Sequence, residues 1–447
     1  MTRIVVPLIL LAGFFVSPAM AKDIYVSKTT GSNKGAGTKE APQKLLWKVI
    51  GKLAPGDRVH VAEGVYNGKK KSGTMPVIPV GDVHIIGGYT ADFSARDPFK
   101  HLTIITGVAD RQADTREVFQ YAPSNPNKCE GPIVLDGFLI DRGCGNYYSG
   151  HGEGGTDKQA GYKDTSCWGY QAINKKKSGS DPAIELLGKT SFTVRNMIMV
   201  NNPWWGISVK AGGKGEVIIE NNLILSYQGR GIEAITGGGW GAPKYVIRNN
   251  TVAFGSAMEG RALSLDPQKG KGTVLVEKNV LAFGAQTGYM TKFGADALTL
   301  NDNLFFGFTK GDAGSGGSGV CNADEFEDEL EHDNDGNVHE CPKFLAKLPK
   351  AYVDKWSQWK GMTSKSFFSS DEVMAARKAA GLGAYELPFF KGKTYPSYEK
   401  LPGGRINYNM SRFPHAYKDG EALMDWKADV LGVIGSDGAR GIQPFKK

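Results

Sequence analysis

Six ionisable side chains stand at matching places in successive stretches of the sequence, and their types could carry out an elimination on an acidic sugar polymer. Such a reaction removes a proton next to a carboxylate, so it needs a base and a positive group that neutralises the carboxylate. A lysine can act as the base when neighbouring cations lower its pKa. The candidates are Lys210 and Lys292 as base, Arg230 and Arg261 as neutralising groups, and Glu233 and Asp266 as acidic partners.

The acidic residues of this set have two other possible uses. Together with Glu185, the carboxylates of Glu233 and Asp266 could hold Ca²⁺, which binds several oxygen ligands. They could also serve a glycoside hydrolase as its paired acid and base. An ordinary salt-bridged sheet surface explains the same residues without any reaction. Aromatic residues in the adjoining loops suit stacking on sugar rings, or packing against neighbouring loops: Trp204, Trp205, Tyr227 and Trp240.

These residues lie in a repeating stretch that runs from Phe192 to Phe306. Each repeat has a short apolar strand, a corner that contains Asn, a second apolar strand, a Gly-rich loop and a third strand. Corresponding corner positions are 25, 28, 29 and 24 residues apart, at Met197, Asn222, Asn250, Asn279 and Asn303. Strands that recur at such a period, with no helical pattern between them, indicate a solenoid.

The corner residues explain how such repeats would stack. One repeat cannot bury its apolar face alone, so it must pack against the next. Asn tolerates the left-handed backbone of a sharp corner, and stacked Asn amides can hydrogen-bond along the pile. The pattern resembles the right-handed parallel β-helix superfamily, the pectate-lyase-like fold of secreted bacterial proteins, over roughly residues 24–306. The resemblance implies an all-β solenoid but no particular activity, because one fold hosts many reactions.

The resemblance also implies where a substrate would bind, since the substrate face of this superfamily commonly lies on the strand after the long loop. The aligned strands are 183–187, 206–210, 231–235, 262–266 and 289–293. Side chains alternate along a strand. The side chains expected to point inward are Ile184, Leu186, Ile207, Val209, Ile232, Ala234, Leu263 and Leu265. The outward side chains are then Glu185, Ser208, Lys210, Glu233, Ser264, Asp266, Met290 and Lys292, with Arg230 and Arg261 at the strand entrances.

The segments before the solenoid predict export and a cap. Residues 1–21 combine a positive Arg3, an apolar run and a small-residue site at Ala19-Met20-Ala21, which is the pattern of a cleaved signal peptide. Residues 22–110 predict a cap and the first rungs, with a strand at 24–27, a helix at 42–53 and a strand at 57–63. Such a cap shields the open edge of the first rung.

The later segments complete the predicted domain organisation. Residues 111–310 form the β-helix, which a long insertion at 141–181 interrupts, and residues 311–342 form a Gly-rich and acidic loop. Residues 343–447 predict an irregular and partly helical C-terminal extension, with helices near 344–360, 370–380 and 420–431.

Five cysteines fit an exported protein, in which thiols can oxidise. The expected pairs are Cys144–Cys167 and Cys321–Cys341, which leave Cys129 over; a Cys129–Cys144 pair is the competing arrangement.

The charge distribution favours an anionic partner. The chain carries a net charge of +8, and the loss of Arg3 with the signal peptide leaves +7. Residues 321–341 hold nine acids and no Lys or Arg, so the rest of the mature chain carries nine charges more, +16. A basic body attracts polyanions, here an anionic polysaccharide or a cell-surface glycan; solvated lysine-rich loops are the alternative. We expect a monomer that binds no nucleic acid. We also expect no membrane span, because no stretch after the signal peptide reaches about 18 apolar residues.

One segment resembles the first half of a calcium loop, with oxygen-bearing side chains at alternate positions and Gly336 at the turn. Its candidate ligands are Asp333, Asp335 and Asn337, so Ca²⁺ is a possible cofactor. Pro342 stands where the closing Glu of such a loop belongs, and Glu340 could substitute for it. A solvated acidic loop is the alternative.

Motifs of individual enzyme families are missing. Gly150-His151-Gly152 resembles a polygalacturonase motif, but the accompanying paired-Asp motifs are absent, and Asp266-Pro267 does not continue as the His-Glu of alginate epimerases. The first hypothesis is a secreted carbohydrate-active protein, preferably a lyase that acts on a uronic-acid polysaccharide. The second is a non-catalytic glycan-binding or structural envelope protein. An enzyme needs several of five side chains in one cleft, with at least one shifted pKa: Lys210, Arg230, Glu233, Asp266 and Lys292. A structural protein would have them paired and covered by loops.

Overall fold

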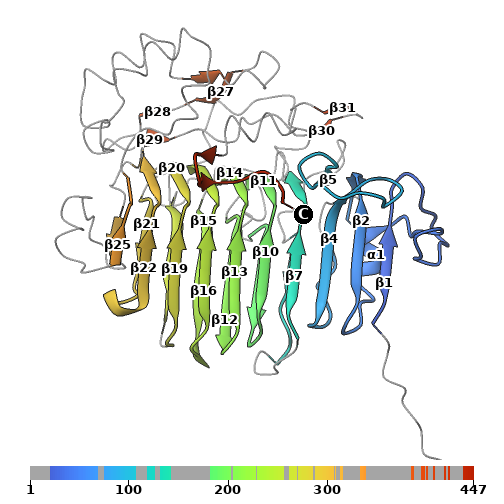
Figure 1. The fold of residues 1–447 in the computed structure, drawn as a ribbon, viewed down its shortest axis with the longest axis horizontal. Helices are drawn as coiled ribbons and strands as arrows, with labels where there is room; N and C mark the ends of the chain where they lie inside the picture. Colours follow the sequence, from blue (N-terminus) through green and yellow to red (C-terminus); the bar gives the residue numbers. More distant parts are fainter. Residues whose placement is uncertain are drawn as a thin grey trace, which may run out of the picture.

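The computed structural model describes most of the repeating part of the chain. It covers residues 21–68, 75–106, 118–125, 131–141, 182–202, 205–227, 229–255, 261–268, 270–284, 287–306, 308, 313–315, 333–338 and 436–446, together with short strand segments between 384 and 422. Three parallel sheets run along the molecule, and each turn of the chain from β4 to β24 adds one strand to each sheet (Figure 1). The molecule is therefore a right-handed parallel β-helix, as the sequence predicts.

Sheet 1 has ten strands, which pair in the order β1 (Asp23–Val26), β2 (Arg58–Ala62), β4 (Val83–Tyr89), β7 (Ile133–Asp136), β10 (Phe192–Arg195), β13 (Glu216–Glu220), β16 (Lys244–Arg248), β19 (Thr273–Glu277), β22 (Leu298–Asn301) and β25 (Asp333–Asp335). Sheet 2 has eight, which are β3 (Gly64–Tyr66), β5 (Thr103–Thr106), β8 (Leu139–Asp141), β11 (Ile198–Asn202), β14 (Leu223–Tyr227), β17 (Thr251–Gly255), β20 (Val280–Gly284) and β23 (Leu304–Phe306). Sheet 3 has seven, which are β6 (Phe119–Tyr121), β9 (Ile184–Gly188), β12 (Ile207–Gly213), β15 (Arg230–Gly241), β18 (Arg261–Asp266), β21 (Tyr289–Thr291) and β24 (Ala313–Ser315).

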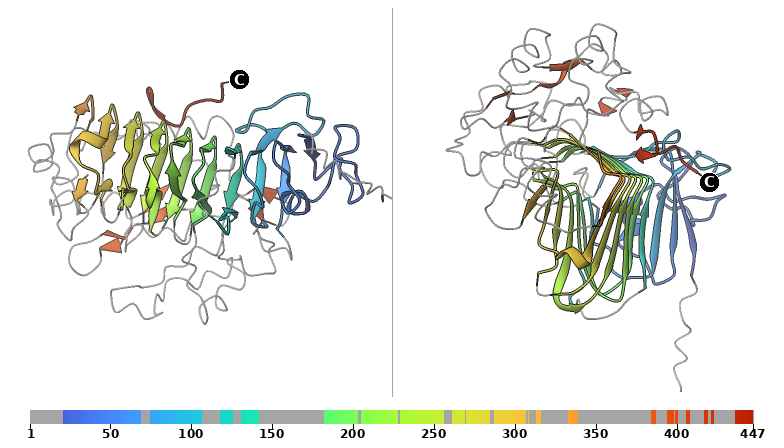
Figure 2. Two further views of the ribbon diagram at one scale, coloured as in Figure 1. Left: turned by 90° about the horizontal axis from the view of Figure 1, so that it is seen from below. Right: turned by 60° about the vertical axis from the view of Figure 1, so that its left-hand side comes forward.

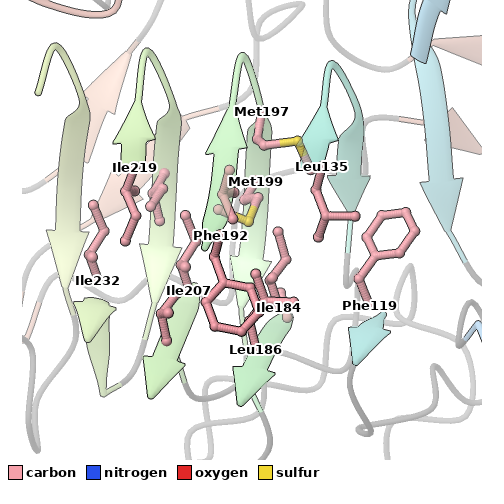
Figure 3. Close-up of a cluster of buried hydrophobic side chains, with 14 of the residues drawn as sticks. Phe119, Leu135, Ile184, Leu186, Phe192, Met197, Met199, Ile207, Ile219 and Ile232 are labelled. Atoms are coloured by element: carbon pink, nitrogen blue, oxygen red, sulfur yellow. The ribbon is translucent and has the colours of Figure 1, made fainter. Parts of the chain in front are cut away.

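The core fills the space that the three sheets enclose (Figures 2 and 3). Every second residue of each strand points inward, and the corresponding residues of successive rungs stack as apolar columns. Figure 3 shows Ile184, Ile207 and Ile232 from three neighbouring rungs in one such column. All eight side chains of sheet 3 that the sequence predicts to point inward belong to this buried core.

The corners between sheets 1 and 2 hold the rungs in register. Residues Asn196, Asn221, Asn249, Lys278 and Asp302 adopt φ values between 51° and 55°, the left-handed conformation that a sharp corner needs. The next residue in each rung builds a ladder of buried side-chain amides, in which each Nδ2 donates to the Oδ1 of the following rung. The distances are 2.8 Å for Asn222 to Asn250, 3.0 Å for Asn250 to Asn279 and 2.9 Å for Asn279 to Asn303.

Each amide of the ladder also satisfies the backbone of the corner. Oδ1 of Asn250 accepts the backbone N–H of Asn222 at 3.1 Å, and Nδ2 of Asn250 donates to the carbonyl of Ile219 at 2.9 Å. The first position is occupied by Met197, whose backbone N–H donates to Asn222 Oδ1 at 3.0 Å. The predicted stacking of Asn side chains is confirmed.

The N-terminal cap follows the predicted order of strand, helix and strand. Helix α1 spans Leu46–Ile50 and buries Leu46, Val49 and Ile50 against the core. It is shorter than the predicted 42–53, because Gln43 forms β-bridges with Val26 and Ser32 that hold it in an extended segment.

The described parts of the C-terminal extension are short antiparallel strand pairs: β26 (Ala384–Glu386) with β27 (Thr394–Ser397), β28 (Glu399–Lys400) with β29 (Ile406–Asn407), β30 (Tyr417–Lys418) with β31 (Glu421–Ala422), and β32 (Ser436–Asp437) with β33 (Arg440–Gly441). The helix predicted at 420–431 is wrong at its start, where β31 pairs with β30 across a tight turn. The helices predicted at 344–360 and 370–380 lie outside the described residues.

The ladder yields a stability prediction. Replacing Asn250 by Ala leaves the backbone N–H of Asn222 and the carbonyl of Ile219 buried without these partners, at about 1–3 kcal/mol for each group. We expect Asn250→Ala to lower the free energy of unfolding by about 3 kcal/mol in urea denaturation. The control is Thr273→Ala at an exposed strand start, which should change stability by less than about 0.5 kcal/mol. Equal stability of the two variants would show that the ladder does not hold the rungs.

Candidate functional site

The first outward row of sheet 3 is polar, and the register places its members side by side on successive strands. It comprises Gln120, Glu185, Ser208, Glu233, Ser264 and Met290. Gln120 donates to Glu185 at 2.7 Å, and Ser208 Oγ donates to Glu233 Oε2 at 2.7 Å. The structure therefore brings together the predicted outward residues of this row, and two of its carboxylates are bound by neighbours in the row.

A second outward row lies two residues further along each strand. Lys210, Ile235 and Asp266 are register partners. Lys292 comes directly after the next strand, β21, and its Nζ lies 2.7 Å from Asp266 Oδ2. The side chain of Lys292 is 48% exposed, so this ion pair faces solvent. Three of the six predicted ionisable residues thus share one row.

A third row, the entrance row, stands where the strands of sheet 3 begin. Arg230 and Arg261 are register partners on adjacent strands. Trp205 and Thr287 complete the row on either side. The backbone N–H of Gly206 donates to the carbonyl of Arg230, which aligns Trp205 with Arg230. The backbone N–H of Ala262 donates to the carbonyl of Thr287, which aligns Thr287 with Arg261. The guanidinium of Arg230 lies 4.8 Å from the ring centre of Trp205, a cation–π contact.

Glu233 connects the entrance row with the first outward row. Its Oε1 forms an ion pair with Nη1 of Arg230, and the residue is 1% exposed. The sequence predicts an outward-facing Glu233 on an exposed surface; the orientation is correct, but the exposure is wrong. A carboxylate at this depth requires a paired cation and hydrogen bonds, and Arg230 and Ser208 supply both.

Three buried polar side chains around the entrance row have no hydrogen-bond partner in the described structure. They are Asn202, Tyr227 and Thr287. Asn202 and Tyr227 are register partners at the ends of β11 and β14, directly before the chain turns into sheet 3. An unsatisfied buried polar group costs about 1–3 kcal/mol, so such a concentration calls for a functional explanation.

Tyr227 is not the exposed aromatic that the sequence predicts. Its side chain is fully buried, and its register partner on the next strand is Gly255. A Cβ at position 255 would lie 2.6 Å from the Tyr227 ring, so only glycine leaves room for it. The ring therefore packs inside the rung, and its hydroxyl is buried there as well. Burial raises the pKa of the Tyr227 phenol well above its usual value.

The other sheets offer no comparable site in the described residues. On sheet 1, charges of opposite sign alternate along one row, Asp136, Arg195, Glu220, Arg248 and Glu277, and neighbours pair. On sheet 2, the residues that alternate with the core positions are themselves fully buried, as Leu225, Ala253 and Ala282 show.

The predicted calcium ligands form another corner. Strand β25 pairs with β22, so Asp335 aligns with Asn301, and Gly336 takes the positive φ of the corner position. The side chain of Asn337 closes the amide ladder, since its Oδ1 accepts Nδ2 of Asn303 at 3.0 Å. The described residues contain no group of three His, Cys, Asp or Glu side chains that could hold a metal. Calcium binding by Asp333 and Asp335 stays a prediction.

Several predicted residues lie outside the described part of the chain. These are Trp204 and all four cysteines of the expected disulfides, Cys144, Cys167, Cys321 and Cys341. Trp240 falls within β15, near its end.

Sequence reasoning missed Asn202 and Thr287. The sequence contains a signal for Thr287, because each residue of the entrance row is followed by a small one: Trp205-Gly206, Arg230-Gly231, Arg261-Ala262 and Thr287-Gly288. Asn202 carries no comparable signal, since its burial follows from the next strand.

Comparison with known proteins concerns the fold. No protein-family model and no curated protein matches the chain. Among solved structures it is similar to the pectate lyase Pel9A, with 11% identity over 65% of this chain and 70% of that one, and a TM-score of 0.33. A family 28 exopolygalacturonase from Yersinia enterocolitica shares 12% identity over 71% of this chain and 63% of its own, with a TM-score of 0.37.

A GH136 lacto-N-biosidase from Eubacterium ramulus is similar at 12% identity over 65% of this chain and 61% of its own, with a TM-score of 0.32. The chain thus spans less than two thirds of the latter two proteins. At these identities and scores, no residue role is transferred. In the described residues, no helix is long and apolar enough to span a membrane.

The unpartnered hydroxyl of Tyr227 gives a prediction about stability and pH. Tyr227→Phe removes a buried hydroxyl that has no partner, so we expect the free energy of unfolding to stay equal or to rise by about 1 kcal/mol. The folded pKa lies above the unfolded value of about 10, so the folded state keeps a proton that the unfolded chain loses above that pH. Stability should therefore fall as the pH rises above about 10, and less steeply in Tyr227→Phe.

Denaturant unfolding at pH 8 and pH 11 measures both effects. Tyr245→Phe is the matched control, because burial also raises the pKa of Tyr245 but its hydroxyl donates to the carbonyl of Ile235. That variant should lose stability at pH 8. A similar loss in Tyr227→Phe would show that the Tyr227 hydroxyl has a partner after all.

The buried ion pair gives a second prediction. Arg230→Met leaves the Glu233 carboxylate buried without its cation, and we expect a loss of about 3 kcal/mol, at the low end of such effects because Arg230 is one-fifth exposed. Adding Glu233→Gln should recover at least half of that loss. Denaturation of the two single variants and the double variant measures the coupling. Additive losses would contradict the pairing.

Proposed function

We propose that the protein acts on an anionic polysaccharide at sheet 3, and that it cleaves a uronic-acid chain by elimination. The observation that carries the proposal is the set of buried, unpartnered polar groups, Asn202, Tyr227 and Thr287, around the arginines of the entrance row. A sugar chain is rich in hydroxyl groups that both donate and accept hydrogen bonds. These protein groups are buried, so a sugar would satisfy them only once the entrance of sheet 3 opens, while a uronate carboxylate would suit the arginines.

The residues divide the elimination between them. In this reaction, a base takes the proton beside the uronate carboxylate, a carbon–carbon double bond forms, and the bond to the glycosidic oxygen breaks. The departing oxygen receives a proton from the base or from water. Arg261, with Arg230 beside it, would stabilise the negative charge that builds up on the carboxylate.

Lys210 is the base in this proposal, and Lys292 is the alternative. Lys292 is engaged with Asp266 in an exposed ion pair, an arrangement that favours the binding of a neighbouring sugar unit over proton abstraction. Lys210 lies in the same outward row, two strands away from Asp266. Glu233 would have a positioning role, since its carboxylate holds Arg230 at the entrance row.

A second candidate function has an observation of its own. Glu233 with Arg230 and Asp266 with Lys292 form ion pairs, and Glu233 is covered. Pairing of this kind is what a non-catalytic protein would show. In that case the same face binds a glycan without cleaving it. Export is part of either proposal and rests on the signal-peptide pattern of residues 1–21.

An absorbance assay separates the two candidates. The protein is incubated with polygalacturonate, with alginate and with a neutral polysaccharide, each with and without Ca²⁺, and the absorbance of unsaturated uronate is followed. We expect a rise on an acidic polymer alone, which Lys210→Ala should lower at least a hundredfold, the scale of general-base catalysis. Tyr227→Phe should keep the fold and weaken substrate affinity by about fivefold, the equivalent of one hydrogen bond.

The matched control is Lys244→Ala, which removes an exposed lysine of sheet 1 that pairs with Glu216. It loses the same charge and should keep full activity. Saturable binding without any absorbance change would reject the lyase and support the glycan-binding protein. Neither binding nor cleavage of any acidic polymer would reject both.

A further inference from the structure

The last described residues of the chain cross the rungs lengthwise. After the tight hairpin of β32 and β33, the segment runs along the corners between sheets 1 and 2 (dark red in Figures 1 and 2). At one end, the segment contacts Asp302, which follows the late strand β22. At the other end it contacts Arg96, which is paired with Asp136 of the early strand β7. The hydrogen bonds that it makes to the rungs join residues 104 to 222 positions apart.

The corner residues bind the backbone of this segment. Asn221 uses both ends of its amide on one residue, since its Oδ1 accepts the N–H of Gln443 at 2.6 Å and its Nδ2 donates to the carbonyl of Gln443 at 3.2 Å. Nδ2 of Asn249 donates to the carbonyl of Ala439 at 2.8 Å, and the carbonyl of Lys278 accepts the N–H of Gly441 at 2.7 Å. These contacts do not depend on the identity of the bound side chains.

Three side chains of the segment add specificity. Arg440 donates from Nη2 to Asp302 Oδ1 at 2.6 Å and from Nε to the Asp302 carbonyl at 2.9 Å. Ile442 is 2% exposed, and its N–H donates to Thr251 Oγ1 at 3.0 Å. At the far end, the guanidinium of Arg96 lies 4.8 Å from the ring centre of Phe445. A charged, an apolar and an aromatic anchor are thus spaced along one short segment of the chain.

The corners can bind a peptide because their geometry repeats. The positive φ at Asn221, Asn249 and Lys278 is nearly the same, so each rung presents its side chain and carbonyl alike. The amide ladder uses the following residue in each rung, which leaves these groups to face outward. We infer that this row of corners is a docking site for a peptide segment, which the chain's own residues 436–446 occupy. The inference is independent of any activity at sheet 3.

Peptide binding to the full chain tests this inference. The receptor is the variant Arg440→Ala/Phe445→Ala, in which two anchors of the internal segment are lost, and the probe is a fluorescent peptide of residues 436–447. Anisotropy should show saturable binding to this receptor, and binding at least tenfold weaker to the unmodified protein, whose own segment competes. A peptide of the same composition in scrambled order should not bind. Absent binding, or equal affinity for both proteins, would overturn the inference.

Two corner variants give a matched comparison in the same receptor. Asn249→Gly keeps the positive φ but deletes the amide that contacts the peptide backbone, so peptide affinity should fall about tenfold. Lys278→Gly also keeps the positive φ and retains the carbonyl that accepts from Gly441, so affinity should not change. Equal affinities in these two variants would contradict the proposed contacts.

A second measurement covers the case in which the double variant does not fold. Amide hydrogen exchange at Gly441 and Gln443 is followed in the otherwise unmodified chain with Asn249→Gly or with Lys278→Gly. Exchange at both amides should be about tenfold faster in Asn249→Gly and unchanged in Lys278→Gly. Identical exchange in the two variants would overturn the docking site.

Discussion

The hydrogen-bonded stack of Asn side chains is the interaction on which the rest of the structure depends. Each amide donates to the next rung and accepts from the previous one, and at the same time it satisfies backbone groups of a buried corner. Because these amides fix the vertical register of successive rungs, they also fix which residues become neighbours in all three sheets. A shift of one residue would turn the core positions outward.

Register turns a dispersed set of residues into rows. Arg230 and Arg261 are 31 positions apart in the sequence by their numbers, yet they are partners on adjacent strands. The same register puts Lys210 and Asp266 into one outward row, with Lys292 on the next strand. The solenoid is therefore a way to place side chains at a spacing of about 4.8 Å, which is set by strand pairing and not by the side chains.

The three sheets use this spacing differently. Sheet 1 alternates positive and negative residues along one row, so its charges cancel between neighbours. From β11 to β23, the described side chains of sheet 2 are buried on both of its faces. Sheet 3 combines charges with unsatisfied polar groups at its entrance, where a folded protein gains no stability from them. Unsatisfied buried polar groups of this kind are expected at functional sites.

The sequence by itself determined the fold, the five ladder positions and the direction of the side chains in sheet 3, because the period of the repeat and the alternation of apolar residues are local patterns. It did not determine burial. Glu233 and Tyr227 were expected at the surface, and only the tertiary structure shows that Arg230 and Ser208 enclose the first and that the second packs against Gly255. The place of Asn337 at the end of the amide ladder is likewise visible only in the tertiary structure. Exposure depends on what neighbouring rungs and distant segments place over a residue, and no local pattern encodes that.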